Sequence, residues 1–191
     1  MFLINKSFWE VKETKNRGLG VFAKKEIKRG TVIGDYLGKL IDTSLIFDPE
    51  LEKDGLYLMW YTNDASIYPD RTKPGIYLFN HSCEPNCYFF IYKWHTLFYA
   101  LRDIKRGEEL TVSYMLSPEQ LWDERGECTH SCLCGSKSCT GTMHMTSEKY
   151  AKWKKYQAGL QKATREPKVY YGKNLPRLRS YPKFIFNTPP I

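Results

Sequence analysis

The sequence predicts a mainly β protein with a few short helices, and three observations support this fold class. Short runs rich in Val, Ile, Tyr and Phe recur through the first 115 residues, separated by Gly, Pro, Asn and Asp. Helical spacing of apolar residues becomes clear only after residue 147. The chain has 191 residues and is 42% hydrophobic, which is enough for the core of one domain and an appendage.

The predicted strands are short and lie between turn residues. They are GLGVFA, TVIGDYLGKLI, CYFFIY, TLFYAL and ELTVSYM. The tetrapeptide IKRG occurs twice, at residues 27–30 and 104–107, each time between two such runs. The repeat predicts two hairpins with the same turn chemistry. The residues around the two copies differ too much to indicate a duplicated unit.

Two helices are predicted in the C-terminal part of the chain. The first begins with Ser117 as N-cap, Pro118 at the first helical position and Gln120 completing a capping box, and is expected to end near Arg125. The second is a basic amphipathic helix, in which apolar residues recur at helical spacing with lysines between them. Those apolar residues are Tyr150, Trp153, Tyr156, Leu160 and Ala163.

The basic charge of the protein is concentrated in residues 147–191. This segment has 11 Lys and Arg against two Glu, a net charge of +9, whereas residues 1–146 have a net charge of −1. From Pro167 onward five prolines predict an extended arm without a regular element. With eight aromatic residues, the segment is suited either to contact nucleosomal DNA or RNA through phosphates or to pack on the domain.

Neither a membrane span nor a signal peptide is predicted, so we expect a soluble protein that is not secreted. All six cysteines lie within residues 83–139. In such a protein, clustered cysteines are more often metal ligands than disulfides. Cys132, Cys134 and Cys139 have the spacing C-x-C-x4-C, which suits three ligands of a tetrahedral zinc ion. The candidates for the fourth ligand are Cys128, His130 and His144, which are local, and Cys83, about 50 residues upstream.

Two other segments carry residues suited to binding or chemistry. The glycines of NRGLGVFA, Gly18 and Gly20, allow the backbone to approach a ligand and present its N–H groups, although a G-x-G is more often only a turn. The segment NHSCEPNC, residues 80–87, brings together an amide, an imidazole, a hydroxyl and two thiols. A cysteine nucleophile is not supported, since no Asp or Asn partner stands at a recognisable spacing for a triad.

Five motifs taken together resemble one family. RGLGVFA, GDYLG, NHSCEPNC, RDIKRGEELTVSY and CLCGSKSCTG occur in the order and at about the spacing of SET-domain protein lysine methyltransferases with a post-SET zinc motif. The resemblance covers about residues 8–143. It implies a fold of small curved sheets with a pseudoknot at the N-H-S segment, short helices, a post-SET zinc lobe and a basic helical extension. The expected domains are 1–116, 117–146 and 147–191.

The resemblance also implies roles for individual residues. The residues implied to bind S-adenosylmethionine are Gly18, Leu19, Gly20, Tyr57, Asn80 and His81. Tyr114, at the end of the E-L-T-x-x-Y strand, corresponds to the catalytic tyrosine, and Tyr36 to a tyrosine that lines the lysine channel. One structural zinc ion would be bound by Cys83, Cys132, Cys134 and Cys139, which leaves Cys87 and Cys128 free.

The implied function is transfer of methyl groups from S-adenosylmethionine to lysine in a basic protein, above all a histone tail, in the nucleus or on chromatin. Two alternatives stay open: a methyltransferase of a non-histone protein, which could be cytoplasmic, and a non-catalytic, zinc-stabilised SET-like binding module. The complete set of G-x-G, N-H and Tyr114 favours the enzyme.

The sequence departs from the family pattern in three places. YLFNH has Tyr77 where histone-directed members have an arginine, which puts the substrate in doubt more than the reaction. No cysteine-rich pre-SET region is recognisable among the seven residues before Phe8. Val112 stands where some members have an aromatic residue that limits methylation, so di- or trimethylation is one expectation.

Overall fold

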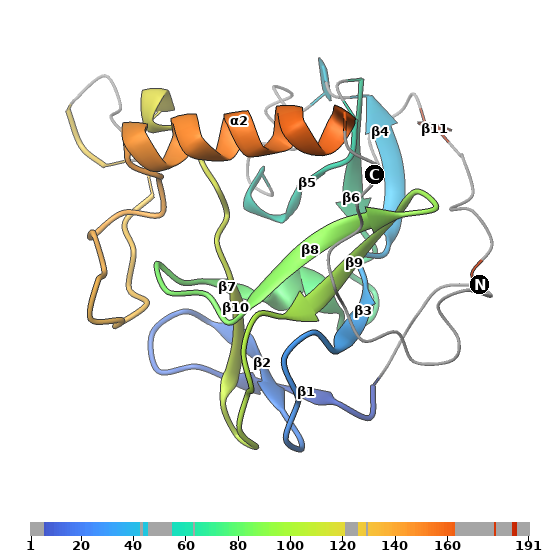
Figure 1. Ribbon diagram of the computed structural model, residues 1–191. Helices are drawn as coiled ribbons and strands as arrows, with labels where there is room; N and C mark the ends of the chain where they lie inside the picture. Colours follow the sequence, from blue (N-terminus) through green and yellow to red (C-terminus); the bar gives the residue numbers. More distant parts are fainter. Residues whose placement is uncertain are drawn as a thin grey trace.

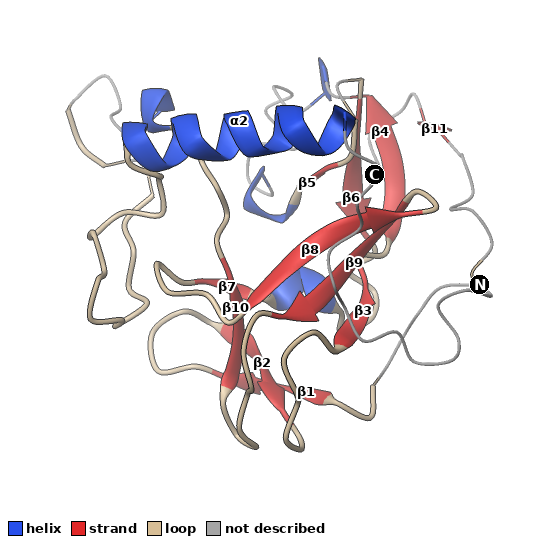
Figure 2. Cartoon of the chain, viewed as in Figure 1, coloured by secondary structure: helices blue, strands red, loops and turns tan. Residues whose placement is uncertain are grey.

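The computed structural model describes residues 6–42, 44–45, 55–62, 64–120, 126–128, 130–162, 178 and 185–186 (Figure 1). Strands make up most of the body, and the long helix lies at the end of the molecule opposite β1 and β2 (Figure 2). The described strands are β1 (Trp9–Glu13), β2 (Leu19–Ala23), β3 (Val32–Asp35), β4 (Gly38–Asp42), β5 (Met59–Trp60), β6 (Ala65–Pro69), β7 (Asn80–His81), β8 (Cys87–Tyr92), β9 (His95–Ala100), β10 (Glu109–Val112) and β11 (Ile185–Phe186). The predicted mainly β fold class is confirmed.

The strands form three small sheets. Their orders are β1-β2-β10-β7, β11-β4-β6-β5 and β3-β9-β8. The hairpin of β8 and β9 fits its sequence, because CYFFIY and HTLFYA supply β-branched and aromatic side chains that pair across the strands. Buried apolar residues from all parts of the body form one main core, which includes Val21, Ile33, Ile67, Phe79 and Leu110.

The two IKRG segments pair with each other rather than making two hairpins. Ile27 and Ile104 exchange both backbone hydrogen bonds, at 2.9 and 2.8 Å. Each segment ends in a turn closed by an i to i+3 bond, with Gly30 (φ +81°) or Gly107 (φ +82°) at the third position, as type II turns require. The turns join β2 to β3 and β9 to β10.

The pairing gives this part of the body approximate two-fold symmetry. β2 pairs with β10, and β3 pairs with β9. The N–H groups of Gly30 and Gly107 donate to the carbonyls of Ala100 and Ala23, each at 2.7 Å. The predicted hairpins were therefore wrong, since each IKRG connects strands of different sheets. The turn chemistry was right, but the partner of each turn lies 77 residues away in the sequence.

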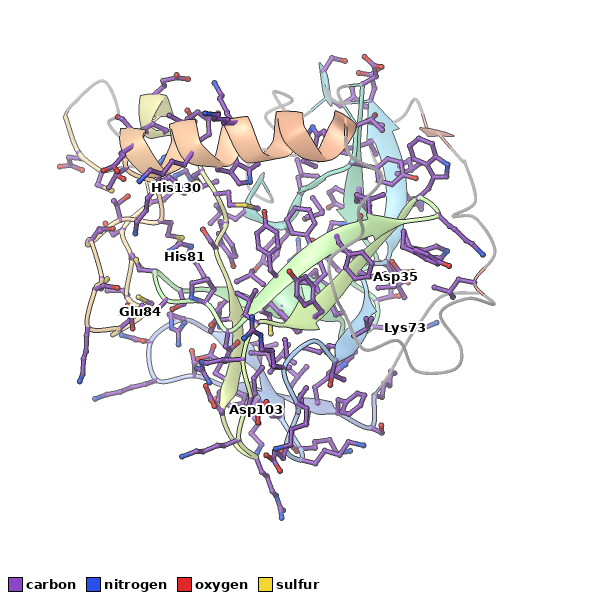
Figure 3. All side chains as sticks on the ribbon, in the orientation of Figure 1. Asp35, Lys73, His81, Glu84, Asp103 and His130 are labelled. Carbon is purple, nitrogen blue, oxygen red and sulfur yellow. The ribbon has the colours of Figure 1, made fainter. Side chains whose placement is uncertain are left out.

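A buried polar pair stands between two of these strands. The carboxylate of Asp35, at the end of β3, is hydrogen-bonded to Nδ1 of His95, at the start of β9, and both side chains are fully buried. Burial and then the nearby Asp35 raise the pKa of Tyr61 to about 12. In Figure 3 Asp35 lies on the opposite side of the body from His81.

The C-terminal part agrees with the predictions only in part. The predicted basic helix is α2 (Ser147–Lys162), and the hydroxyl of Thr146 caps it by accepting the N–H of Lys149 at 3.3 Å. At Ser117 the described residues form a 3-10 turn, Pro118–Gln120, and the rest of the helix predicted there lies outside the described residues. The prediction that the arm has no regular element was wrong, because β11 pairs in parallel with β4.

Candidate functional site

Strand β10 brings the predicted site segments together. On one side it pairs in parallel with β7, so that Thr111 and Val112 stand opposite Asn80 and His81. On its other side it pairs with β2, where Leu110 stands opposite Val21. The glycine turn that leads into β2, the Asn-His dipeptide of β7 and the residues after β10 are thus neighbours, although up to 96 positions separate them in the sequence.

The two glycines of the turn are required for different reasons. Gly18 has φ +65°, in the left-handed region that disfavours residues with a Cβ. A Cβ on Gly20 would lie 2.7 Å from Oε1 of Glu109 and 2.9 Å from Nδ2 of Asn80. The missing side chain at Gly20 therefore lets two polar groups approach the backbone of the turn.

Asn80 is held by acceptors on two strands. Its Nδ2 donates to the carbonyl of Leu19 at 3.0 Å and to Oε1 of Glu109 at 2.9 Å. The other carboxylate oxygen of Glu109 accepts from Arg17 at 2.5 Å, and Arg17 also donates to the carbonyl of His81 at 3.3 Å. These groups join the glycine turn, β7 and β10 in one network.

His81 is a buried, neutral side chain that supports Tyr114. Burial, followed by the nearby Arg17 cation, lowers the pKa of His81 to about 4. Its Nδ1 accepts the backbone N–H of Tyr114 at 3.1 Å, and the two rings meet edge to face with centroids 5.4 Å apart. The imidazole is therefore in position to fix the backbone and ring of Tyr114.

Four tyrosines surround the next part of the site. The Tyr114 hydroxyl donates to the carbonyl of Phe79 at 3.2 Å, and the Tyr36 hydroxyl donates to the carbonyl of Tyr57. Tyr57 and Tyr77 meet edge to face at 6.0 Å. Burial and then Tyr57 raise the pKa of Tyr114 to about 12, and burial followed by the neighbouring tyrosines raises that of Tyr36 well above its usual value. Both phenols are neutral at physiological pH.

Asn86 fastens the far end of the same segment. Its Nδ2 donates to the carbonyl of Glu109 at 2.7 Å and to the Glu108 carboxylate at 3.2 Å, while its Oδ1 accepts the N–H of Thr111 at 2.8 Å. The segment from Asn80 to Asn86 is thus tied at both ends to β10 and to the residue just before it.

Four thiols meet beside this segment in an arrangement that fits zinc. The sulfurs of Cys83, Cys132, Cys134 and Cys139 all lie within 4.8 Å of one another, and those of Cys83 and Cys132 are 3.8 Å apart. Tetrahedral coordination with Zn–S bonds of about 2.3 Å places sulfurs about 3.8 Å apart. The cluster is therefore compatible with one zinc ion, which would join the segment at residues 80–87 to the C-terminal lobe.

The other candidate ligands have different partners. Cys128 Sγ contacts the hydroxyl of Thr142 at 3.4 Å. His130 Nδ1 lies 3.0 Å from Nε2 of His144, and His144 Nδ1 donates to the carbonyl of Ser117. Because the Ser117 carbonyl can only accept, the ring proton of His144 is on Nδ1. This leaves Nε2 of His144 to accept from Nδ1 of His130. A second contact joins the lobe to the segment, since the Ser138 hydroxyl donates to Glu84 at 2.6 Å.

The residues predicted from the sequence meet in the site, whereas three residues that hold them in place were not predicted. Arg17, Asn86 and Glu109 all stand inside motifs that were recognised, yet no role followed from their positions. Arg17 is 64 residues from its partner His81 and 92 from its partner Glu109. Asn86 is 25 residues from Thr111, and Glu109 is 29 residues from Asn80. The only signal in the sequence was that charged and amide residues occupy strand and turn positions in those motifs.

Comparison with known proteins identifies a matching family model and related chains. The model described as SET domain matches residues 18–115, just over half of the chain. The H3 lysine-36 specific histone-lysine N-methyltransferase of Candida albicans is 32% identical over an alignment of 150 residues that covers 71% of this chain and 17% of the relative. The corresponding human protein is 31% identical over an alignment of 178 residues that covers 82% of this chain and 6% of the relative. The chain thus spans less than a fifth of either relative.

Solved structures share the fold. KRYPTONITE, solved with mCHH DNA, an H3(1-15) peptide and SAH, aligns with a TM-score of 0.59 at 21% identity, over 71% of this chain and 29% of that chain. Arabidopsis thaliana SUVH6, solved with SAM, aligns with a TM-score of 0.57 at 26% identity, over 71% and 33%. Within the described residues, no helix combines the length and apolar character that a membrane crossing needs.

Proposed function

We propose the function of this chain from one premise: it belongs to the SET-domain family. It is an S-adenosylmethionine-dependent protein-lysine methyltransferase whose substrate is a histone, and it acts in the nucleus on chromatin. The relatives named as histone-lysine N-methyltransferases support the reaction and the substrate. The observation that carries the proposal is the meeting of the glycine turn, Asn80, His81 and Tyr114 around β10.

The proposed roles follow from these positions. Bound S-adenosylmethionine would supply a methyl group on a positively charged sulfur. Gly18, Leu19, Gly20, Asn80, His81 and Tyr57 would bind it, and the zinc held by Cys83, Cys132, Cys134 and Cys139 would hold the lobe against residues 80–87. In the transfer, the lone pair of the lysine nitrogen would form the bond to the methyl carbon as the carbon–sulfur bond breaks. The electron pair of the carbon–sulfur bond would remain on sulfur, and the product ammonium would lose a proton.

Tyr114 and Tyr36 would prepare the lysine rather than accept its proton. A free lysine has a pKa near 10.4 and must lose its proton before it can attack. Removal from water among buried tyrosines, close to a positive sulfur, lowers that pKa. Because both hydroxyl protons are donated to backbone carbonyls, the phenol oxygens are left as acceptors for the amine and for the polarised methyl group. Alignment supplies most of the acceleration.

The test is transfer of labelled methyl groups to core histones and, separately, to a mixed protein lysate. We expect label on a histone with the wild-type chain and little with Tyr114→Phe. Tyr99→Phe is the matched control and should keep full activity, because Tyr99, on β9, packs against Tyr88 and Phe90 of β8. Cofactor binding without label in either pool would instead indicate a non-catalytic binding module, and label only in the lysate a non-histone substrate.

We also propose that α2 contacts nucleosomal DNA. Four of its lysines, Lys149, Lys152, Lys154 and Lys155, are exposed. Replacing all four by Gln should weaken methylation of nucleosomes, and reduce its salt dependence, more than methylation of a histone peptide. This variant is preferable to deletion of residues 147–191, because Leu178 is buried against the body. Equal losses on both substrates would contradict DNA contact.

A further inference from the structure

Glu109 has no role in the proposed chemistry, yet its carboxylate lies between Asn80, a proposed cofactor-binding residue, and Arg17, which directly precedes the glycine turn. One carboxylate oxygen accepts from the Asn80 side chain at 2.9 Å, and the other accepts from Arg17 at 2.5 Å. The side chains of Arg17 and Glu109 are 18% and 15% exposed. A pair this well covered by the protein is held more firmly than a surface ion pair.

The carboxylate determines which way the Asn80 amide faces. An asparagine side chain can be turned by 180°, which exchanges its oxygen and nitrogen. Here the two neighbours of Nδ2, the Leu19 carbonyl and the Glu109 carboxylate, can only accept. Both N–H bonds of Asn80 are therefore used inside the protein, and its Oδ1 is the atom left to accept a hydrogen bond from a ligand.

The carboxylate is itself fixed from the opposite side. Arg17 bonds to Glu109 and also to the carbonyl of His81, so it joins the side-chain network to the backbone of β7. The absence of a side chain at Gly20 leaves the room that Glu109 and Asn80 occupy. Three elements thus converge on one carboxylate, whose position is fixed by contacts within the protein.

We propose that Glu109 is a positioning residue of the cofactor site, with Arg17 as its counter-ion. It acts through Asn80 by presenting the Oδ1 of that amide to an N–H or O–H donor of S-adenosylmethionine. This inference rests on the proposed function, because it assigns Asn80 to the cofactor. It predicts that the effect of Glu109 on cofactor binding passes through one side chain.

A neighbouring set of residues provides a matched control. Glu108 also combines an arginine and an asparagine, since its Oε1 bonds to Arg102 and accepts from Asn86 at 3.2 Å. Asn86, however, uses its Oδ1 on the N–H of Thr111 inside the fold. Glu108→Ala therefore removes the same kind of interaction at the adjacent position. The side-chain amide that it affects, that of Asn86, is not assigned to the cofactor.

The experiment is a double-mutant cycle on the whole 191-residue chain. The dissociation constant of S-adenosylhomocysteine is measured by calorimetry for wild type, Glu109→Ala, Asn80→Ala and the double variant. We expect Glu109→Ala to weaken binding about tenfold, as loss of a hydrogen bond to a charged group does. In the Asn80→Ala background the same change should weaken binding by about twofold or less, because the two residues act as a unit.

The outcomes separate the inference from the function on which it rests. Equal effects of Glu109→Ala in both backgrounds, or a tenfold effect of Glu108→Ala, would overturn the positioning role alone. A wild-type chain that binds neither S-adenosylhomocysteine nor S-adenosylmethionine would overturn the proposed function. Nuclear magnetic resonance of the Asn80 side-chain amide gives a readout without ligand: we expect its two N–H signals to move toward those of a free amide in Glu109→Ala and to stay in place in Glu108→Ala. Unmoved signals in Glu109→Ala would also overturn the positioning role.

Discussion

The hydroxyl proton of Tyr114 is already used in a hydrogen bond within the protein. Its hydroxyl donates to Phe79, its backbone N–H donates to His81, and its ring rests against the imidazole. Burial and Tyr57 raise its pKa to about 12. A phenol in this state orients partners through its oxygen and does not act as a proton acceptor near neutral pH.

The pH dependence of methyl transfer should show this property. We expect the rate to rise with pH as the substrate lysine loses its proton, with no fall caused by Tyr114 below about pH 11. The folded chain keeps the Tyr114 proton above pH 10, where an unfolded tyrosine loses it, so the free energy of unfolding should fall as the pH rises from 10 toward 12. A descending limb near about pH 9 in a chain still folded by circular dichroism would contradict this assignment.

The Asp35–His95 pair should matter for stability and not for binding. Removing one partner of a fully buried polar pair leaves the other uncompensated, so Asp35→Ala should lower the free energy of unfolding by about 3 kcal/mol. Asp35→Asn keeps an acceptor and should cost less. Both are measured by urea unfolding. Weaker binding of S-adenosylhomocysteine by the folded Asp35→Asn chain would show instead that the pair supports the cofactor site.

Single residues were predictable where the motif itself carries the chemistry. Tyr114 and Asn80 were expected in the site through the family resemblance, and the G-x-G turn through the backbone freedom of its glycines. The structure brings these segments together around β10. Glu109 was not expected there, since a glutamate in a strand looks like an exposed charge until its two partners are known. Its role depends on Arg17 and Asn80, which reach it only through strand pairing.

At the level of elements, the two IKRG turns depend on their glycines. Among the residues that the structure describes, a Cβ on Gly107 would contact nothing within 4 Å, and its φ of +82° is the feature that favours glycine there. Gly107→Ala should therefore lower the free energy of unfolding by about 1 kcal/mol, the cost of a left-handed residue with a side chain. Gly107→Asn should cost less, because asparagine tolerates that region better.

Urea unfolding of the two Gly107 variants would check this, with an unchanged dependence on denaturant concentration. Equal losses for Ala and Asn would show that a contact, and not backbone conformation, requires the glycine. The strands flanking both turns were predictable from composition, and so was the glycine chemistry. That the turns face each other was not, because alternation of apolar residues carries no information about which strand is the partner.

For the whole molecule, the four-thiol cluster, which is compatible with zinc, joins segments from distant parts of the chain. Cys83→Ser should lower the zinc content below one ion per chain and lower the melting temperature, because metal binding contributes directly to folding. Chelation of the wild type should lower the melting temperature in the same way. Zinc is measured by elemental analysis and melting by calorimetry.

Cys128→Ser is the matched control for the zinc prediction, since Cys128 contacts Thr142 and lies outside the cluster. It should keep one zinc ion. The reverse result, with zinc lost in Cys128→Ser and kept in Cys83→Ser, would make Cys128 the fourth ligand. The C-x-C-x4-C spacing predicted three ligands, but residue chemistry alone left the fourth open, because the approach of Cys83 depends on the fold of the whole body.

Residues 80–86 are bonded at both ends to β10 or to the residue before it, which should make local unfolding of this segment slow. Asn80 and Asn86 are both bonded to β10 or to Glu108 just before it, while Cys83 between them faces the thiol cluster. No local fraying can release the middle of such a segment. The amide hydrogens of Thr111 and Tyr114, bonded to Asn86 and His81, should therefore exchange with deuterium only when the entire domain unfolds, and so be among the slowest in the chain.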